Sequence, residues 1–528
     1  MDRGKQMTIY RKNLIIKRMF KKGNKLKVLF VASEAAPFAQ AGGLGSVVHS
    51  LTRALLRLGY DTRIMMPFYG SIDRAVYPTR MVYDKLEVPD GNSEVIICNV
   101  KTLASSDGKN ADGNSQTQPQ VYFLENQEYY EQRANIYGYA DDAARWALFC
   151  RGTLEFIRFN KDWRPDVIVA CDWQTGLVPN YLKTVYKNNP FLKDIATVFS
   201  IHNLSYQGVF DHRFVSEMDY DDGHSPAPEI KNPRLLKINS MRRGIIYADV
   251  INTVSPTYAK EITTSDYGEL LDGLLRERRP HLFGILNGID YETKNPETDP
   301  NVEVKYNAKK LDERLKNKAL LRHKFNFPET SDDVFLLGLV SRFSEQKGMD
   351  LLMEALPPLL DNFNFQFAVV GTGDSKYLSF FTELGRNYPN VAAHLSFSSV
   401  LPSAVFAGAD AVIIPSKFEP CGLTQMEAMR YGAVPIVRKT GGLADSVIDY
   451  DPISKKGTGF VFEKFNSYSL FGAVVRGMET HKHPKVWQNI QKNVMAADFS
   501  WSKSAAEYAK LFLKAVNFHR QEDNFRQK

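Results

Sequence analysis

Short apolar runs alternate with longer amphipathic stretches along most of the chain. A strand buried on both faces of a parallel sheet reads as a continuous apolar run, and such runs fall at 27–32, 121–124, 167–170, 197–201, 334–340, 365–370, 411–415 and 434–437. Polar loops and helical patterns separate them. This alternation predicts an α/β protein built on doubly wound parallel sheets.

The first apolar run leads into a glycine pair and then a helix. Apolar residues recur at Leu44, Val47, Val48, Leu51, Leu55 and Leu58, which places them on one helical face, and Gly59 ends the pattern. Between strand and helix lie Gly42 and Gly43. A turn of this kind lets backbone N–H groups approach a phosphate. Tight packing of the helix on the sheet would need the glycines equally well.

The stretch 416–432 closes a second strand–loop–helix unit. Good helix formers fill 423–431, and Gly432 suits the left-handed position after a helix. The loop 416–422 therefore lies at the carboxyl end of a strand, where open α/β sheets bind ligands. It carries Glu419, and a carboxylate beside a phosphate-binding turn needs a cation or developing positive charge nearby. The alternative is that Glu419 only caps the helix.

Other strand ends carry chemistry as well. Arg342 and Lys347 follow the run at 334–340, and two cations beside a glycine suggest a phosphate clamp, although a solvated loop would look the same. The loops 171–176 and 202–208 follow two further strands. His202 begins the second loop and is either a ligand-binding or a structural histidine.

Composition excludes several classes of function. The chain has 528 residues, 44% hydrophobic and 24% charged, which indicates two or three globular domains. Of its net charge of +7, residues 1–27 contribute +9 through ten Lys/Arg and one Asp, so the remainder carries −2. A nearly neutral globular part argues against a nucleic-acid partner.

The basic head has no long apolar run and no cleavage site, so it does not read as a secretory signal. We expect residues 1–25 to form a disordered tail; the alternatives are that translation starts later, at Met7 or Met19, and that the segment is an organellar transit peptide.

The rest of the chain shows three further features. The composition of residues 104–120 predicts a mobile loop. No apolar stretch reaches the roughly 20 residues that span a bilayer. Four cysteines without zinc or CxxC spacing indicate reduced thiols in a cytoplasmic protein.

Several motifs acquire meaning together. The glycine pair is followed by His202-Asn-Leu-Ser-Tyr-Gln-Gly208, by Thr253-Val-Ser-Pro-Thr-Tyr258 and by Asn287-Gly-Ile-Asp290. Ser341-Arg342, Gln346-Lys-Gly348 and Glu419-Pro-Cys-Gly-Leu-Thr-Gln425 complete the series. In this order and spacing the chain resembles the bacterial-type glycogen and starch synthases, from about Lys27 to Val516.

The resemblance implies a GT-B fold, that is, two Rossmann-like domains facing across a cleft that holds the active site. The expected parts are an acceptor-side domain at 26–283, a donor-side domain at 284–500 and a helix at 501–520 that crosses back to the first domain. The implied reaction transfers glucose from ADP-glucose or UDP-glucose to the non-reducing end of an α-1,4-glucan, with retention. No metal or other cofactor is implied, and no membrane partner.

Residue roles follow from the same resemblance. Arg342 and Lys347 would hold the distal phosphate, while Glu419, His202 and Asn287 would surround the glucose; Glu419, His202, Arg342 and Lys347 form the implied catalytic set. The remaining implied substrate contacts are Gln40, Gly42, Gly43, Asp172, Asn203, Tyr206, Cys421, Gly422, Leu423 and Thr424.

The chain departs from the family pattern at three positions. Gln40 stands where the family has Lys, Ser46 where it has an acid shortly after the glycines, and Gln174 where it has His. Two alternative functions follow. One is a glucan-binding or regulatory relative with impaired catalysis, and the other is a related GT-B glycosyltransferase with a small acceptor.

Overall fold

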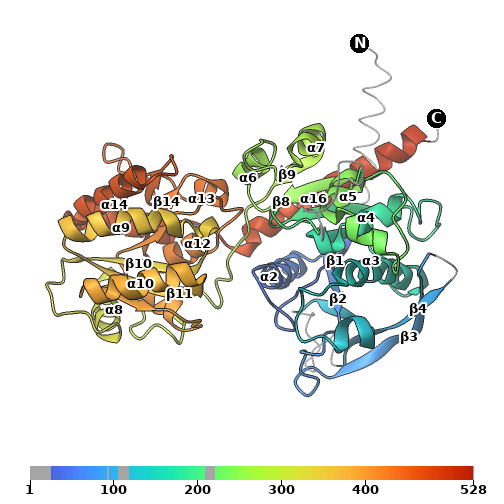
Figure 1. Ribbon diagram of the computed structural model, residues 1–528, viewed down its shortest axis with the longest axis horizontal. Coiled ribbons are helices and arrows are strands. Elements are labelled where there is room, and N and C mark those ends of the chain that lie inside the picture. Colours follow the sequence, from blue (N-terminus) through green and yellow to red (C-terminus); the bar gives the residue numbers. More distant parts are fainter. Residues whose placement is uncertain (1–24, 92–93, 105–117, 209–220, 527–528) are drawn as a thin grey trace, which may run out of the picture. The chain divides into compact units, whose positions relative to one another are not determined.

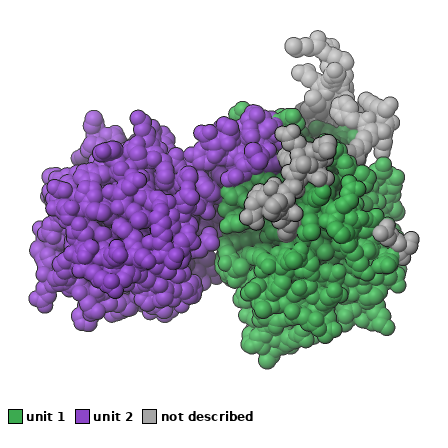
Figure 2. Space-filling view, viewed as in Figure 1, with its two compact units in different colours: residues 1–252, 277–281, 505–528 green, residues 253–276, 282–504 purple. Residues whose placement is uncertain are grey.

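A computed structural model describes residues 25–91, 94–104, 118–208 and 221–526. The basic head, most of the loop expected at 104–120 and residues 209–220 lie outside this part of the chain. Two compact units are present (Figure 2): unit 1 comprises Met1–Asn252, Glu277–His281 and Ala505–Lys528, and unit 2 comprises Thr253–Arg276 and Leu282–Ser504. Residues 253–276, which the sequence assigned to the first domain, cluster with unit 2.

A nine-stranded sheet has the order β3-β4-β5-β2-β1-β6-β7-β8-β9 (Figure 1). Its strands are β1 Lys27–Val31, β2 Asp61–Pro67, β3 Thr79–Pro89, β4 Val95–Leu103, β5 Gln120–Glu125, β6 Val167–Cys171, β7 Ala196–Ile201, β8 Val250–Thr253 and β9 Leu282–Gly284. The central strands β5, β2, β1, β6 and β7 are parallel, as the apolar runs predict. At one edge β3 and β4 form an antiparallel pair, which the sequence reasoning did not foresee.

Helices in unit 1 surround this sheet. They are α2 Leu44–Arg57, α3 Asp142–Phe159, α4 Leu177–Lys183, α5 Ser240–Tyr247 and most of α16 Trp501–Arg526, with shorter turns η1 Gln127–Glu131, η2 Trp173–Thr175, η4 Pro233–Lys237 and η5 Arg279–His281. The apolar face of α2 is buried through Leu44, Val47, Val48, Leu51 and Leu55, as its spacing predicts.

Unit 2 contains a six-stranded sheet of order β12-β11-β10-β13-β14-β15, parallel throughout. Its strands are β10 Phe335–Phe343, β11 Phe365–Gly373, β12 Val391–His394, β13 Ala411–Ile414, β14 Val434–Arg438 and β15 Phe460–Phe462. The helices of the unit are α6 Pro256–Glu261, α8 Leu311–Lys324, α9 Met349–Asn362, α10 Ser375–Asn387, α11 Leu401–Gly408, α12 Thr424–Arg430, α13 Gly441–Ser446, α14 Ser467–His481 and α15 Pro484–Ala496; α7 Asp272–Glu277 and the turn η6 Glu345–Lys347 complete the list.

The strand order of each unit reverses at one point. In unit 2 the reversal lies between β10 and β13, and in unit 1 it lies between β1 and β6. Chains leaving adjacent strands at such a point turn to opposite faces of the sheet, which opens a crevice at the carboxyl ends where ligands bind. The loops that carry Gln40, Asp172, Lys347 and Glu419 leave these strands, and the loop that begins with His202 leaves the neighbouring strand β7.

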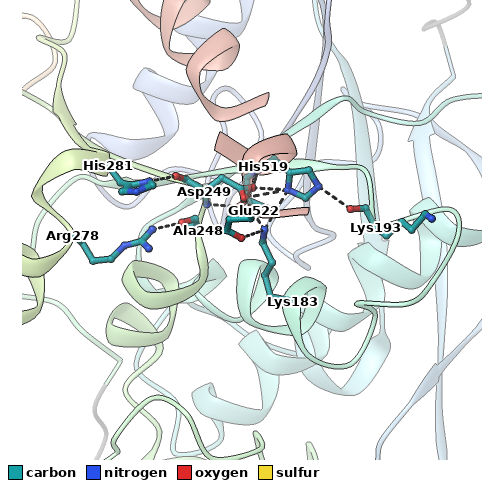
Figure 3. A network of polar contacts seen from close by, with 9 residues as sticks. Lys183, Lys193, Ala248, Asp249, Arg278, His281, His519 and Glu522 are labelled. Carbon is teal, nitrogen blue, oxygen red and sulfur yellow. Dashed lines mark hydrogen bonds and ion pairs between the residues drawn. The ribbon is translucent and has the colours of Figure 1, made fainter. Parts of the chain in front are cut away.

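A buried polar network fixes α16 within unit 1 (Figure 3). The carboxylate of Asp249 is fully buried and accepts hydrogen bonds from the Thr197 amide and from Lys183 Nζ, each over 2.7 Å. His519 of α16 places Nδ1 3.1 Å from the same carboxylate and Nε2 2.8 Å from the Lys193 carbonyl. Both ring nitrogens face acceptors, which favours the imidazolium form, although Lys183 Nζ also lies 3.3 Å from Nδ1.

Among the described residues, no helix combines the length and the apolar character that crossing a bilayer requires. All four cysteines are buried, unpaired thiols.

Candidate active site

A cavity of about 210 Å³ opens at the reversal point of unit 2. The end of β10 supplies Arg342, the turn after it supplies Lys347, and the loop after β13 supplies Glu419. Gly422 and Thr424 line the same cavity. The structure therefore brings together five residues that the sequence analysis singled out at separate positions.

Lys347 and Glu419 form a close ion pair in this cavity. Lys347 Nζ donates to Glu419 Oε2 over 2.6 Å, and the Ser416 hydroxyl donates to the same oxygen over 2.8 Å. The side chain of Glu419 is 7% exposed and that of Lys347 21%. Helix α12 begins after Leu423 without a side-chain cap, so the capping alternative for Glu419 does not describe this site. The carboxylate instead has the cation that its position called for.

Arg342 presents a second cation to the cavity. It is exposed, and its strand position pairs with Thr372 of β11. Within the described part of the chain, its guanidinium makes no hydrogen bond or ion pair. An arginine is always charged and offers a planar fork of donors that matches phosphate oxygens. Arg342 and Lys347 thus place two positive charges around one cavity.

The turn after Glu419 is held by its neighbours. Gly422 has φ +70°, a left-handed conformation that favours glycine. Gln425 Nε2 donates to the carbonyls of Cys421 and Gly422. Burial raises the pKa of the Cys421 thiol to about 12, so it stays protonated and is not a nucleophile at neutral pH.

Asn287 lies close to this turn and has an unsatisfied oxygen. Its backbone N–H faces the Cys421 sulfur, and the residue is 5% exposed. Among the described side chains, Asn287 Oδ1 is one of the buried polar atoms that lack a hydrogen-bond partner. A buried acceptor left unpaired costs free energy, which a donor from a bound molecule would recover.

The first glycine pair, in unit 1, has room around it. A Cβ added at Gly42 or Gly43 would meet no atom within 4 Å, and neither residue has a positive φ. At Gly45, by contrast, a Cβ would lie 3.2 Å from the Ala39 carbonyl oxygen. Space for a side chain is therefore tight at Gly45 and open at the pair. The absence of side chains at 42 and 43 leaves backbone open to an approaching molecule.

The carboxylate of Glu34 binds the backbone of this turn. It is 3% exposed and accepts hydrogen bonds from the amides of Ala41 over 2.7 Å and Gly42 over 3.0 Å, and from the Tyr137 hydroxyl over 2.5 Å. The Gly42 amide is thus already paired with an internal anion. On the carbonyl side, Gln40 Nε2 donates to Gly42 O over 3.0 Å and to Ser46 Oγ over 2.8 Å.

Asp172 and His202 meet at the ends of β6 and β7. The His202 amide donates to Asp172 Oδ1 over 2.7 Å, and Asp172 has a positive φ of 59°. Burial raises the pKa of Asp172 to about 7, although the amides of His202 and Asn203 oppose the shift. Burial also lowers the pKa of His202 to about 4, so this imidazole is neutral at physiological pH.

The remaining predicted residues of unit 1 lie nearby in the chain. Asn203 Oδ1 accepts from the Ser205 amide over 3.1 Å, and Tyr206 is 59% exposed. Gln174 is 6% exposed, and its Oε1 is another buried oxygen without a hydrogen-bond partner among the described residues. The predicted site residues therefore form two groups, one in each unit. No cluster of three or more metal-ligand side chains occurs among the described residues.

Comparison with known proteins gives the family. Residues 27–277 match the family described as starch synthase catalytic domain, and residues 321–494 match glycosyl transferases group 1. A glycogen synthase of Thermotoga petrophila is 40% identical over 503 residues, which cover 93% of this chain and 99% of that protein. The chain belongs to the glycogen and starch synthase family. It is accordingly a glycosyltransferase, and its two parallel-sheet α/β units form a GT-B fold.

Two further members of this family support the assignment. A glycogen synthase of Geobacillus stearothermophilus is 39% identical over 493 residues, covering 93% of this chain and 98% of the relative. The catalytic domain of starch synthase IV from Arabidopsis thaliana, solved with ADP and acarbose, is 31% identical with a TM-score of 0.78; the match covers 94% of this chain and all of that one.

Sequence reasoning missed Glu34, Ser416 and Tyr137 as parts of these sites. Glu34 lies in the first loop after a buried apolar strand, and this position could have indicated a role in the site. Its function, however, is to bind backbone amides, which no side-chain motif reveals. Tyr137 reaches Glu34 from more than a hundred positions further along the chain, so only the folded structure connects the two.

Proposed function

We propose that this protein transfers glucose from ADP-glucose or UDP-glucose to the non-reducing end of an α-1,4-glucan, with retention of the anomeric configuration. The observation that carries the proposal is the cavity of unit 2, where Arg342 and the Lys347–Glu419 ion pair lie together at the reversal point of the sheet. The starch synthase IV relative was solved bound to ADP and acarbose, which supports a nucleotide donor and a glucan-like acceptor here.

The charges in this cavity suit glycosyl transfer. Cleavage of a glycosyl phosphate puts negative charge on the leaving diphosphate and positive, oxocarbenium-like charge on the sugar. We assign the leaving diphosphate to Arg342 and Lys347, and the developing sugar charge to the carboxylate of Glu419. Because Lys347 already pairs with Glu419, a bound diphosphate competes for the same ammonium group, and the carboxylate is then free to face the sugar.

Other residues of both units complete the assignment. We assign Gly42 and Gly43 to the donor because they present a surface without side chains; the Gly42 amide and carbonyl are themselves bonded to Glu34 and Gln40. Gln40 adds a neutral amide to the same turn. Asn287 supplies the unpaired oxygen, which fits a glucose hydroxyl as donor. We assign the remaining contacts with glucose or glucan to Asp172, His202, Asn203, Tyr206, Cys421, Gly422, Leu423 and Thr424.

A catalytically impaired, glucan-binding homologue is the second candidate. One observation favours it: Gln40 and Ser46 make a neutral hydrogen bond at the two positions where the family pattern has a base and an acid. If the leaving group needs a third cation, this chain binds glucan but turns over slowly or not at all.

Incubation with glycogen primer and either ADP-glucose or UDP-glucose tests the proposal. We expect diphosphate release with at least one donor and a chain-extended glucan as product, with new α-linkages visible by NMR. Glu419→Gln serves as the inactive control, because it removes the charge and keeps the shape. Absence of release above blank with both donors contradicts the proposal, and primer binding without turnover supports the second candidate. A discrete glycoside product would instead indicate a small acceptor. We place the reaction in the cytoplasm.

A further inference from the structure

The second glycine pair differs from the first because it has no room around it. Gly441 and Gly442 begin α13, and a Cβ at Gly441 would lie 1.9 Å from the Glu419 carbonyl oxygen. A Cβ at Gly442 would lie 1.9 Å from the Cys421 carbonyl oxygen. The Gly442 amide also donates to Glu419 O over 3.1 Å. The backbone of this pair therefore supports the backbone of Glu419 directly.

Glu261 holds the support in place. This last residue of α6 accepts hydrogen bonds from the Gly441 amide, over 3.0 Å to Oε1 and 3.1 Å to Oε2, and from the Thr440 hydroxyl over 3.0 Å. Thr440 is fully buried, and Gly441 has φ +44°. A carboxylate that binds one amide with both oxygens fixes both the position and the direction of that N–H.

A second contact joins the same two helices without reaching the site. The amide and hydroxyl of Thr257 donate to the two oxygens of Asp445, over 2.8 and 2.7 Å. This contact joins α6 to the body of α13, and in the described chain neither the Thr257 hydroxyl nor the Asp445 carboxylate bonds to the Gly441–Gly442 pair. Glu261 is therefore the member of the α6–α13 contact that leads to Glu419. Glu261 does not line the cavity itself.

We propose that Glu261 is a positioning residue for glucosyl transfer: it fixes Gly441, whose backbone sets the position of Glu419 relative to Lys347. The inference rests on the proposed function, because it assumes that Glu419 acts on the sugar. A displacement of about 1 Å at a reacting group costs on the order of 10²-fold in rate. Loss of Glu261 should consequently lower turnover, while ground-state binding of the nucleotide through Arg342 stays intact.

The test compares two substitutions of Glu261 with a control substitution in the same helix contact. Glu261→Gln removes the charge and one acceptor, and Glu261→Asp keeps the charge but shortens the reach. Thr257→Val is the matched control, because it removes a hydrogen bond from the α6–α13 contact without touching Gly441. We expect Glu261→Gln to lower kcat about tenfold or more, with the donor KM and the Kd for ADP within about twofold of the parent. We expect Thr257→Val to keep its kcat within about twofold.

Hydrogen exchange supplies a readout that needs no turnover. In Glu261→Gln the amides of 416–424 and of Gly441 should exchange at least about tenfold faster, and in Thr257→Val they should not. If Glu261→Gln does not fold, Glu261→Asp gives the same comparison.

The outcomes separate the inference from the proposed function. Parental kcat in folded Glu261→Gln overturns the inference, and so does an equal loss of kcat and ADP affinity, which indicates general disturbance of unit 2. If amide hydrogen exchange at 416–424 is unchanged in Glu261→Gln, the inference is overturned, even if the parent protein shows no transferase activity. Full activity of Glu419→Gln, by contrast, removes Glu419 from the reaction and counts against the proposed function.

Discussion

The side-chain amide of Gln40 donates a hydrogen bond to the hydroxyl of Ser46, 2.8 Å away, across the first glycine pair. The same amide also holds the Gly42 carbonyl. Gln40 therefore fixes the turn without adding charge to it. Because the leaving diphosphate gains negative charge as its bond to glucose breaks, a cation at this position would stabilise the transition state more than the ground state.

Gln40→Lys should raise kcat with ADP-glucose or UDP-glucose roughly tenfold or more, equivalent to about 1.4 kcal/mol. Gln40→Met is the control, because it removes the hydrogen bonds to Gly42 and Ser46 without adding charge. Steady-state kinetics of both variants distinguish charge from turn conformation. A kcat of Gln40→Lys at or below the parental value, with the fold intact by circular dichroism, refutes the idea that a missing charge limits the enzyme.

Glu419→Gln and Arg342→Ala should each lower kcat by at least about 10²-fold, because each removes electrostatic stabilisation of the transition state. Glu345→Gln is a suitable comparison: its surface ion pair with Lys417 lies on the turn that carries Lys347, and it should keep near-parental activity. Initial rates at saturating donor are the measurement. Parental kcat in either site variant would remove that residue from the active site.

Gly43→Ala should leave stability unchanged and impair the use of the donor. The added methyl group meets no protein atom, yet it occupies space that we assign to the substrate. We expect the donor kcat/KM to fall about tenfold, roughly 1.4 kcal/mol. Gly244→Ala provides the opposite pattern, since its Cβ would lie 2.5 Å from the Phe199 ring and should cost about 1–3 kcal/mol of stability. Thermal unfolding measures the stability of both variants, and steady-state kinetics measure their donor kcat/KM. An equal kcat/KM for Gly43→Ala and the parent contradicts the assignment of this space to the substrate.

Asp172 should give the reaction a pH dependence near neutrality. Burial raises its pKa to about 7, and the ionised carboxylate is the better acceptor for the amide of His202. Activity should therefore rise with pH through about 7, and Asp172→Asn should flatten this rise.

The protonation of Asp172 also affects stability. The folded state binds a proton that the unfolded state lacks between about pH 4 and 7, so this group lowers the stability of the protein as pH rises through that window. Asp172→Asn should gain thermal stability at pH 8 more than at pH 5.

His519 should contribute the same sign of slope for a different reason. Burial favours its neutral form, but the hydrogen bond and charge of Asp249 outweigh this and raise the pKa of His519 above its usual value. The stabilisation is then complete below pH 6.5 and is lost as pH rises through the raised pKa. Between pH 6 and 9 the melting temperature should fall more steeply with pH for the parent than for His519→Gln. The exposed His323 is the control, and an identical slope for parent and His519→Gln contradicts the prediction.

The elements that the sequence predicted are those whose surroundings are uniform. Val28 to Val31 and Ala411 to Ile414 are buried on both faces, so a continuous apolar run identified them. In β3 the buried residues Leu86 and Val88 alternate with exposed ones and appear only at one end, which left too weak a pattern to recognise.

The site was predicted where side chains carry its chemistry, and the rest required the folded chain. Arg342, Lys347 and Glu419 have charges that a motif can register, and the structure gathers them in one cavity. Glu34 and Glu261 act on backbone amides of distant loops. Such a contact depends on tertiary approach, and no local spacing encodes it. The two glycine pairs look alike in sequence, and only their surroundings show that one is open and the other is packed.

The position of His519 also has a consequence for how the chain folds during synthesis. Unit 2 is complete in sequence at Ser504, whereas unit 1 still awaits the residues from Ala505 onward. Until the ribosome has released the segment around residue 519, the buried carboxylate of Asp249 lacks one of its two nearby cationic partners. Domains usually fold as units in the order in which they emerge. Here the unit that begins first is completed last, so the contacts of α16 within unit 1 form only when nearly the whole chain has been synthesised.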